Sequence, residues 1–164
     1  MPLRKLKSIP EEIRGKIVTH IEKVLSRREE ILFAFIYGSF IRKDEMDRYG
    51  DIDVAVYPLR SVEDKESYFI EAGIEKELWE DLASSNLDLL PVEVINLRLA
   101  PYRLRVSLLR HPYLMIKKDE DAFTSFIEET SSLAMANNHL RKESIREVLE
   151  EMITGGCSKR PRIV

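Results

Sequence analysis

One stretch of this sequence, FIYGSFIRKDEMDRYGDIDVAVY at residues 35–57, combines a glycine–serine pair with two closely spaced aspartates. Gly38 and Ser39 follow an apolar run, and Asp51 and Asp53 open the next one. A glycine lets an anion approach the backbone closely, and a serine hydroxyl with nearby amide groups can bind a phosphate. Paired carboxylates supply the oxygen ligands that Mg²⁺ prefers. These residue types indicate chemistry on a metal-bound phosphate.

A third carboxylate, Glu93, comes from a later apolar segment. Residues 51–57 alternate so that the isoleucine and valines share one face and the two aspartates share the other. Residues 92–97, VEVINL, alternate in the same way, with Glu93 opposite the valines. If the two segments are neighbouring strands, the three carboxylates meet on one face. Carboxylates so close repel unless a cation neutralises them. We therefore predict a Mg²⁺ site formed by Asp51, Asp53 and Glu93, suited to a two-metal in-line displacement at phosphorus.

The phosphate-binding residues that we predict are Gly38, Ser39, Arg42 and Lys43. The arginine and lysine lie one turn beyond the serine, where their charges could reach the same phosphates.

The remaining polar candidates carry less weight. His20, His111 and His139 do not cluster in the sequence, so structural or surface positions are expected. Asp88 could be mistaken for the third carboxylate, but Glu93 lies within the predicted strand and is the stronger choice.

Apolar periodicity predicts the elements that must position these residues. The order of helices and strands indicates an α/β (α+β) fold, a sheet with helices mainly on one face and further C-terminal helices. We expect helices over 10–28, 62–83 and 100–111, a short helix after Ser39, and two helical segments over 119–153 around Ser131 and Ser132. We expect a central strand over 31–37, further strands over 51–57, 92–97 and 113–117, and a loop over 46–50.

Length and composition narrow the class of protein. The 164 residues suit one domain over 1–118, with a helical extension over 119–154 packed on it and a flexible basic tail over 155–164. A net charge of −3 gives no strong nucleic-acid signal. The apolar runs are too short to span a membrane, and no apolar segment follows the basic N-terminus. With a single cysteine, no intramolecular disulfide can form, and a cytoplasmic location is expected.

The segment GSFIRKDEMDRYGDIDVAV resembles the signature of the DNA polymerase β-type nucleotidyltransferase superfamily, and the chain length is similar to that of its minimal nucleotidyltransferases (MNT). The resemblance covers roughly residues 30–117 and implies a nucleotidyltransferase-type mixed sheet. It implies that Gly38, Ser39 and Arg42 hold the triphosphate and that the two aspartates bind metal. Glu93 lies where the third carboxylate, usually an aspartate, is expected.

Three features depart from the common pattern of that superfamily. Eleven residues separate Ser39 from Asp51, slightly more than usual, and Gly50 replaces a frequent serine. Glu93 is one methylene longer than aspartate. None of these changes removes a ligand.

The resemblance implies Mg²⁺-dependent transfer of a nucleoside monophosphate, AMP from ATP in our expectation, to an acceptor hydroxyl. Small stand-alone members often act as antitoxins beside a HEPN-domain toxin, which they modify with AMP, so a HEPN toxin is the expected partner. Two alternatives stay open: a non-catalytic nucleotide- or toxin-binding module, and a small-molecule (antibiotic-type) nucleotidyltransferase. A homodimer, the base preference and the acceptor also stay open.

Overall fold

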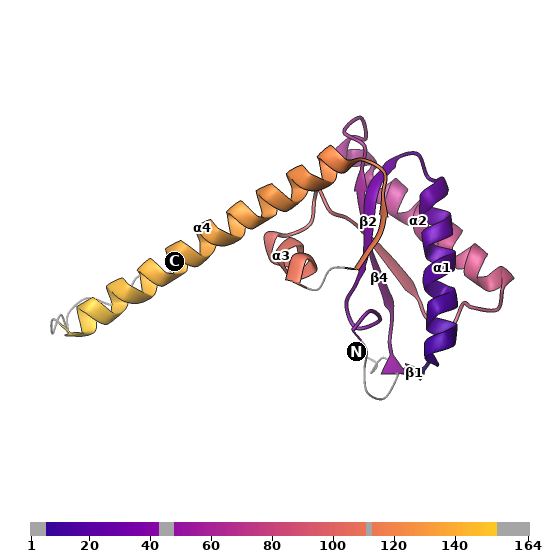
Figure 1. The fold of residues 1–164 in the computed structure, drawn as a ribbon, viewed down its shortest axis with the longest axis horizontal. Helices are drawn as coiled ribbons and strands as arrows, with labels where there is room; N and C mark the ends of the chain where they lie inside the picture. The colour runs from indigo at the N-terminus through magenta and orange to yellow at the C-terminus, as the bar shows by residue number, and fades with distance from the viewer. Residues whose placement is uncertain (1–5, 43–47, 111–112, 154–164) are drawn as a thin grey trace.

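A four-stranded mixed sheet forms the centre of the protein, as the computed structural model of residues 6–42, 48–110 and 113–153 describes it (Figure 1). The spatial order is β5-β4-β2-β6, where β2 is Ile31–Tyr37, β4 Ile52–Pro58, β5 Val92–Asn96 and β6 Tyr113–Lys117. Strand β2 pairs antiparallel with β4 and β6, and β4 pairs parallel with β5. Because β2 is central and covered on both faces, it is apolar at nearly every position. The predicted fold class is confirmed.

Helices α1 (Glu11–Arg27) and α2 (Ser67–Ser84) cover one face of the sheet (Figure 1). Each helix contributes apolar residues at helical spacing, and each strand contributes alternate residues. Burying this face removes a large apolar area from water, which is the main favourable term in folding. The principal buried side chains are Ile17, Ile21, Val24 and Leu25 of α1, Ile74, Leu78 and Leu82 of α2, and Ile52, Val54 and Val56 of β4.

The second face of the sheet carries an aromatic cluster under α3 (Tyr102–Arg110) and the first turns of α4 (Glu120–Ile153). Phe33 stacks on Tyr57 with ring centroids 4.6 Å apart and contacts Phe126 of α4 at 5.4 Å. Helices therefore lie on both sides of the sheet, with α1 and α2 together on one side and α3 with the start of α4 on the other (Figure 1). The alternation that points Tyr57 into this cluster also places Asp53 on the same face.

Helix α4 is one continuous helix, so the prediction of two segments divided at Ser131 and Ser132 was wrong. Serine inside a helix costs only some tenths of a kcal/mol relative to alanine, too little to end a helix flanked by good helix formers. The first turns pack through Phe123 and Phe126, whereas Met135 and Met152 are about three-quarters exposed. Figure 1 shows the second half of α4 extending away from the sheet.

The division into a domain over 1–118 and an extension over 119–154 stays a prediction, and the tail over 155–164 lies outside the described residues. Among the described helices, none is both long enough and apolar enough to cross a membrane.

Three short elements were not anticipated. Strand β1 (Lys7–Ser8) pairs antiparallel with β3 (Arg48–Tyr49), inside the segment for which a loop was expected. Two-residue strands are too short to show a periodicity in sequence. A single 3₁₀ turn, η1 (Asp64–Glu66), precedes α2. The short helix expected after Ser39 is a hydrogen-bonded turn over the described residues 38–42.

Candidate active site

Three carboxylates gather where strands β4 and β5 begin. Asp53 and Glu93 are direct partners in the parallel β4–β5 register, and Asp51 immediately precedes β4. Each of the three offers a carboxylate oxygen within 4.8 Å of the others. Both aspartates are half-buried and Glu93 is exposed, so the cluster is open to solvent on one side. Asp88, the alternative third carboxylate, is not part of this group.

This donor set fits a hard divalent cation. Three carboxylate oxygens at such separations can share one or two ions, and the open side leaves coordination positions for phosphate oxygens. Oxygen-only ligation suits Mg²⁺ better than it suits softer metals, which take imidazole or thiolate ligands.

Gly38, at the end of β2, is required for the shape of this site. Its φ is +79°, in the left-handed region that glycine adopts at little cost. A Cβ atom on residue 38 would lie 2.5 Å from Oδ2 of Asp53. The close approach follows from the register, in which Tyr37 is the cross-strand partner of Asp53. Residue 38 is therefore glycine because its backbone contacts a carboxylate of the cluster.

The residues after Gly38 form a compact turn beside the carboxylates. The amide N–H groups of Ile41 and Arg42 both donate to the carbonyl of Gly38, at 3.3 and 3.2 Å. Ser39 is exposed at the tip of the turn, and Phe40 is fully buried against Tyr49. The turn thus presents the serine to solvent on a well-packed base.

Tyr37 is a site residue that the sequence analysis missed. Burial raises the pKa of its phenol well above the ordinary value, and the negative charges of Asp53, Glu93 and Asp51 raise it further. The phenol therefore stays protonated and can donate a hydrogen bond. An aromatic residue directly before Gly38 was the available signal, but only the β2–β4 register shows that its side chain lies on the carboxylate face.

A small pocket lies between the Gly38 turn and α3. It is lined by Tyr37, Gly38, Ile41, Arg42, Ser107 and Leu108. Arg42 is exposed, as a residue that meets a ligand from solvent would be. Lys43, the fourth predicted phosphate-binding residue, lies outside the described residues.

The two histidines that the structure describes lie away from this site. Nδ1 of His20 lies 2.8 Å from Asp81 between α1 and α2, and Nε2 of His139 lies 3.0 Å from Glu143 on α4. His111 lies outside the described residues.

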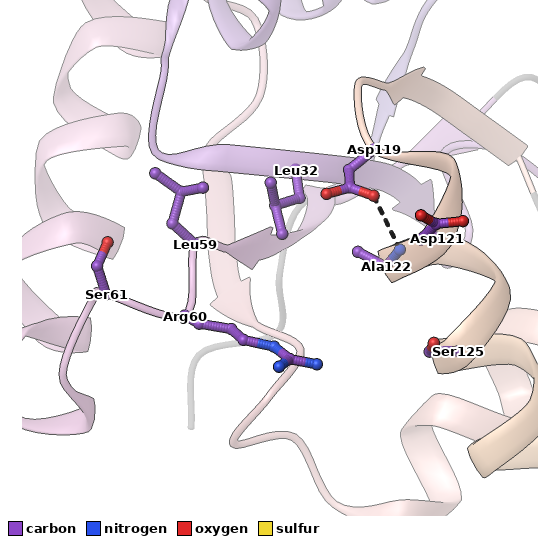
Figure 2. Close-up of a pocket in the computed structure, with 8 residues that line it drawn as sticks. All are labelled: Leu32, Leu59, Arg60, Ser61, Asp119, Asp121, Ala122 and Ser125. Atoms are coloured by element: carbon purple, nitrogen blue, oxygen red, sulfur yellow. Dashed lines mark hydrogen bonds between the residues drawn. The ribbon is translucent and has the colours of Figure 1, made fainter.

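A second cavity lies at the opposite end of β2, and Figure 2 shows the residues that line it. Arg60 approaches from the loop after β4, and Asp121 and Ser125 approach from the first turns of α4. The Asp119 carboxylate accepts a hydrogen bond from the Ala122 amide at 3.0 Å, which caps α4. Among the described residues, none of the predicted site residues lines this cavity.

A family model described as "Polymerase beta, Nucleotidyltransferase" matches residues 19–121, a span that includes all the predicted site residues. The chain belongs to this family. Family membership makes it a nucleotidyltransferase, which confirms the resemblance found in the sequence. Among curated proteins, none matches the sequence.

Solved structures of toxin–antitoxin complexes share the fold. A chain of the Shewanella oneidensis complex between a tri-AMPylated HEPN toxin and an MNT antitoxin is 16% identical with a TM-score of 0.55, over 83% of this protein and 98% of that chain. A chain of a toxin–antitoxin structure with AMP-PNP is 18% identical with a TM-score of 0.56, over 80% and 98%. A chain of the MntA–HepT toxin–antitoxin is 16% identical with a TM-score of 0.51, over 85% and 99%. At these identities the likeness concerns the fold.

Proposed function

We propose that this nucleotidyltransferase transfers AMP from ATP, with Mg²⁺, to a hydroxyl group of a partner protein, a HEPN-domain toxin whose antitoxin it is, in the cytoplasm. The observation that carries the proposal is the cluster of Asp51, Asp53 and Glu93, whose oxygens lie within 4.8 Å of one another beside the Gly38 turn. A phosphate-binding turn next to a set of metal ligands is the arrangement that phosphoryl transfer needs, because that chemistry depends on positioning and charge neutralisation.

The three carboxylates would hold one or two Mg²⁺ ions. Bound Mg²⁺ would neutralise charge on the triphosphate and polarise the α-phosphate.

Residues of the chain itself bind the triphosphate and accept the proton of the acceptor hydroxyl. The Ser39 hydroxyl and the amide groups of the turn bind the β- and γ-phosphates, with the Arg42 guanidinium as a charged donor. The acceptor oxygen forms a bond to the α-phosphorus, and the bond between that phosphorus and the β-phosphate oxygen breaks. Pyrophosphate leaves with the electron pair of the broken bond. The hydroxyl proton passes to a carboxylate oxygen of Glu93, which is the exposed member of the cluster.

A protein acceptor is supported by solved structures with the same fold. One is a HEPN toxin carrying three AMP groups in complex with an MNT antitoxin, and another contains AMP-PNP. The net charge of −3 disfavours a polymeric nucleic-acid substrate.

The test is to incubate the protein with ATP, Mg²⁺ and a candidate HEPN toxin, such as the product of the neighbouring gene, and to measure intact masses. We expect an added AMP on the toxin that is absent with the Asp51→Asn, Asp53→Asn double variant. Asp81→Asn is a matched control, because Asp81 pairs with His20 away from the site.

An unmodified toxin together with unconsumed ATP would refute the proposal and favour a non-catalytic binding module. Consumption of ATP with no adduct on the toxin would mean that water takes the AMP and would refute the toxin as acceptor. The small-molecule alternative instead predicts a nucleotidylated product only when a hydroxyl-bearing antibiotic is added.

A further inference from the structure

The turn that follows Gly38 is held from behind by Arg14, a residue of helix α1. The Arg14 Nε–H donates to the carbonyl of Phe40 at 2.8 Å, and its Nη2–H donates to the carbonyl of Ile41 at 3.1 Å. The guanidinium also lies 5.8 Å from the centroid of the Phe40 ring. One side chain therefore makes two charge-assisted hydrogen bonds and a cation–π contact with two consecutive residues.

These bonds control which backbone groups the turn presents. The carbonyl of Gly38 accepts from two amides of the turn, and the carbonyls of Phe40 and Ile41 accept from Arg14. Three acceptor oxygens that would repel a phosphate are therefore each paired with a donor of the protein. Within the part of the chain that the structure describes, the amide N–H groups of Ser39 and Phe40 have no acceptor. The donors of the turn thus remain available to an anion.

We propose that Arg14 is a positioning residue for nucleotide binding: by holding the Phe40 and Ile41 carbonyls, it keeps the Gly38–Arg42 turn in the form that binds phosphates. Arg14 acts on the far side of the turn and does not touch the nucleotide. It lies before the residues that the family model matches, 19–121, and outside the glycine–serine motif. The inference rests on the proposed function, because it assigns the turn to the triphosphate.

Arg28, at the other end of α1, separates this role from a general packing role. Its Nη2–H donates to the carbonyl of Gly73 at 3.0 Å, and its Nε–H donates to Glu77 at 2.6 Å. Arg28 is therefore also a partly buried guanidinium that links α1 to another segment, but it is remote from the carboxylates. Arg28→Ala removes a comparable set of bonds without altering the turn.

The experiment measures the dissociation constant of Mg·ATP by titration calorimetry with the full chain, well below the melting temperature of each variant. We expect Arg14→Ala to weaken binding about tenfold or more, because two charge-assisted bonds that orient the turn are lost. The dissociation constant of Arg14→Lys should lie between those of Arg14→Ala and the wild type, because a single ammonium group cannot hold both carbonyls as the planar guanidinium does. Adding guanidinium ions at a non-denaturing concentration should restore part of the affinity of Arg14→Ala. Arg28→Ala should lower the melting temperature and change the dissociation constant less than twofold.

A second readout needs no nucleotide. The amide protons of Ile41 and Arg42 should exchange faster with solvent in Arg14→Ala than in the wild type, since their hydrogen bonds to Gly38 define the turn. Mn²⁺ affinity, measured by electron paramagnetic resonance, should change much less than ATP affinity, because the metal ligands lie on β4, β5 and the residue before β4.

The outcomes are distinguishable. If the wild type binds Mg·ATP and Arg14→Ala binds it equally well, or if Arg28→Ala weakens binding as much, the inference fails and the proposed function stands. Equal losses of Mn²⁺ and ATP affinity in Arg14→Ala would also overturn it, because the defect would then be global. If the wild type itself does not bind Mg·ATP, both the inference and the proposed function fail.

Discussion

Replacing Gly38 by alanine tests the link between the glycine–serine turn and the carboxylate cluster. The structure gives two reasons for a penalty. Residue 38 has a φ of +79°, and an added Cβ would lie 2.5 Å from Oδ2 of Asp53. The left-handed conformation costs an alanine about 1–2 kcal/mol. Relieving that contact requires the Asp53 carboxylate, the end of a half-buried side chain, to rotate away, which costs about 0.5–1.5 kcal/mol more.

The expected loss in free energy of unfolding for Gly38→Ala is therefore about 1.5–3.5 kcal/mol. A domain of this size has about 5–15 kcal/mol to lose, so the variant should still fold. Gly15 provides a matched control in the same protein. It lies inside α1, and a Cβ there would meet nothing within 4 Å. Gly15→Ala should stabilise the protein by about 0.5–1 kcal/mol, the opposite sign.

Urea denaturation of four proteins separates the two terms: wild type, Gly38→Ala, Asp53→Ala and the double variant. Without the Asp53 carboxylate the contact disappears, so the cost of Gly38→Ala should fall to the backbone term of about 1–2 kcal/mol. An equal cost in both backgrounds would refute the steric explanation. A gain in stability for Gly38→Ala would refute the backbone explanation as well.

Three further predictions concern charges and buried polar groups. Glu93→Gln removes one of three clustered charges, so without divalent cations it should raise the free energy of unfolding by up to about 1 kcal/mol. Mg²⁺ should stabilise the wild type more than this variant. Urea denaturation curves in chelator and in Mg²⁺ measure both effects, and an equal Mg²⁺ effect on the two proteins would contradict the prediction. Burial opposes ionisation of Glu30, but the hydrogen bond and charge of Arg28 outweigh it, so the pKa of Glu30 lies below the ordinary value of a glutamate. The stability that this interaction contributes is present above the ordinary pKa and is lost as pH falls through the lowered pKa. Glu30→Gln should therefore destabilise the protein by up to about 1 kcal/mol near neutrality and much less in strong acid. A difference in stability that does not change with pH would disprove the assignment. Asn96 is 4% exposed, its side-chain amide donates to Ser67 Oγ at 3.0 Å, and its side-chain oxygen accepts from the Arg98 amide at 2.9 Å. Asn96→Ala should therefore lower the free energy of unfolding, measured by chemical denaturation, by about 1–3 kcal/mol. An unchanged midpoint would show that water replaces these bonds.

Local patterns predicted the main strands well. Alternation in residues 51–57 and 92–97 placed the valines on the face that α1 and α2 cover and the acids on the other, as observed. The side-chain period of a strand is a property of the backbone, so it can be read without knowing the neighbours. The uninterrupted apolar run 31–37 likewise predicted a central strand, which β2 is.

The differences have two sources: contacts between distant segments, and a helix that continues through residues of low propensity. The β1–β3 pair joins Lys7 to Tyr49, two segments with no shared local pattern. The two serines suggested a break in α4 because their low helix propensity was weighted above that of the surrounding residues. The segment after Ser39, for which a turn or two of helix was expected, forms a turn over the described residues 38–42, and its carbonyls accept hydrogen bonds from Arg14 of another helix.

The sequence by itself determined which chemical groups are available and which side of each strand they occupy. Two aspartates, a glutamate and a glycine–serine pair were readable, because residue type and strand alternation are local properties. The tertiary structure decided that Asp53 lies opposite Glu93, that Gly38 contacts Asp53, and that Tyr37 and Arg14 flank the site. Those facts depend on strand order and register, which are set by burying both faces of the sheet at once, and no single segment encodes that requirement.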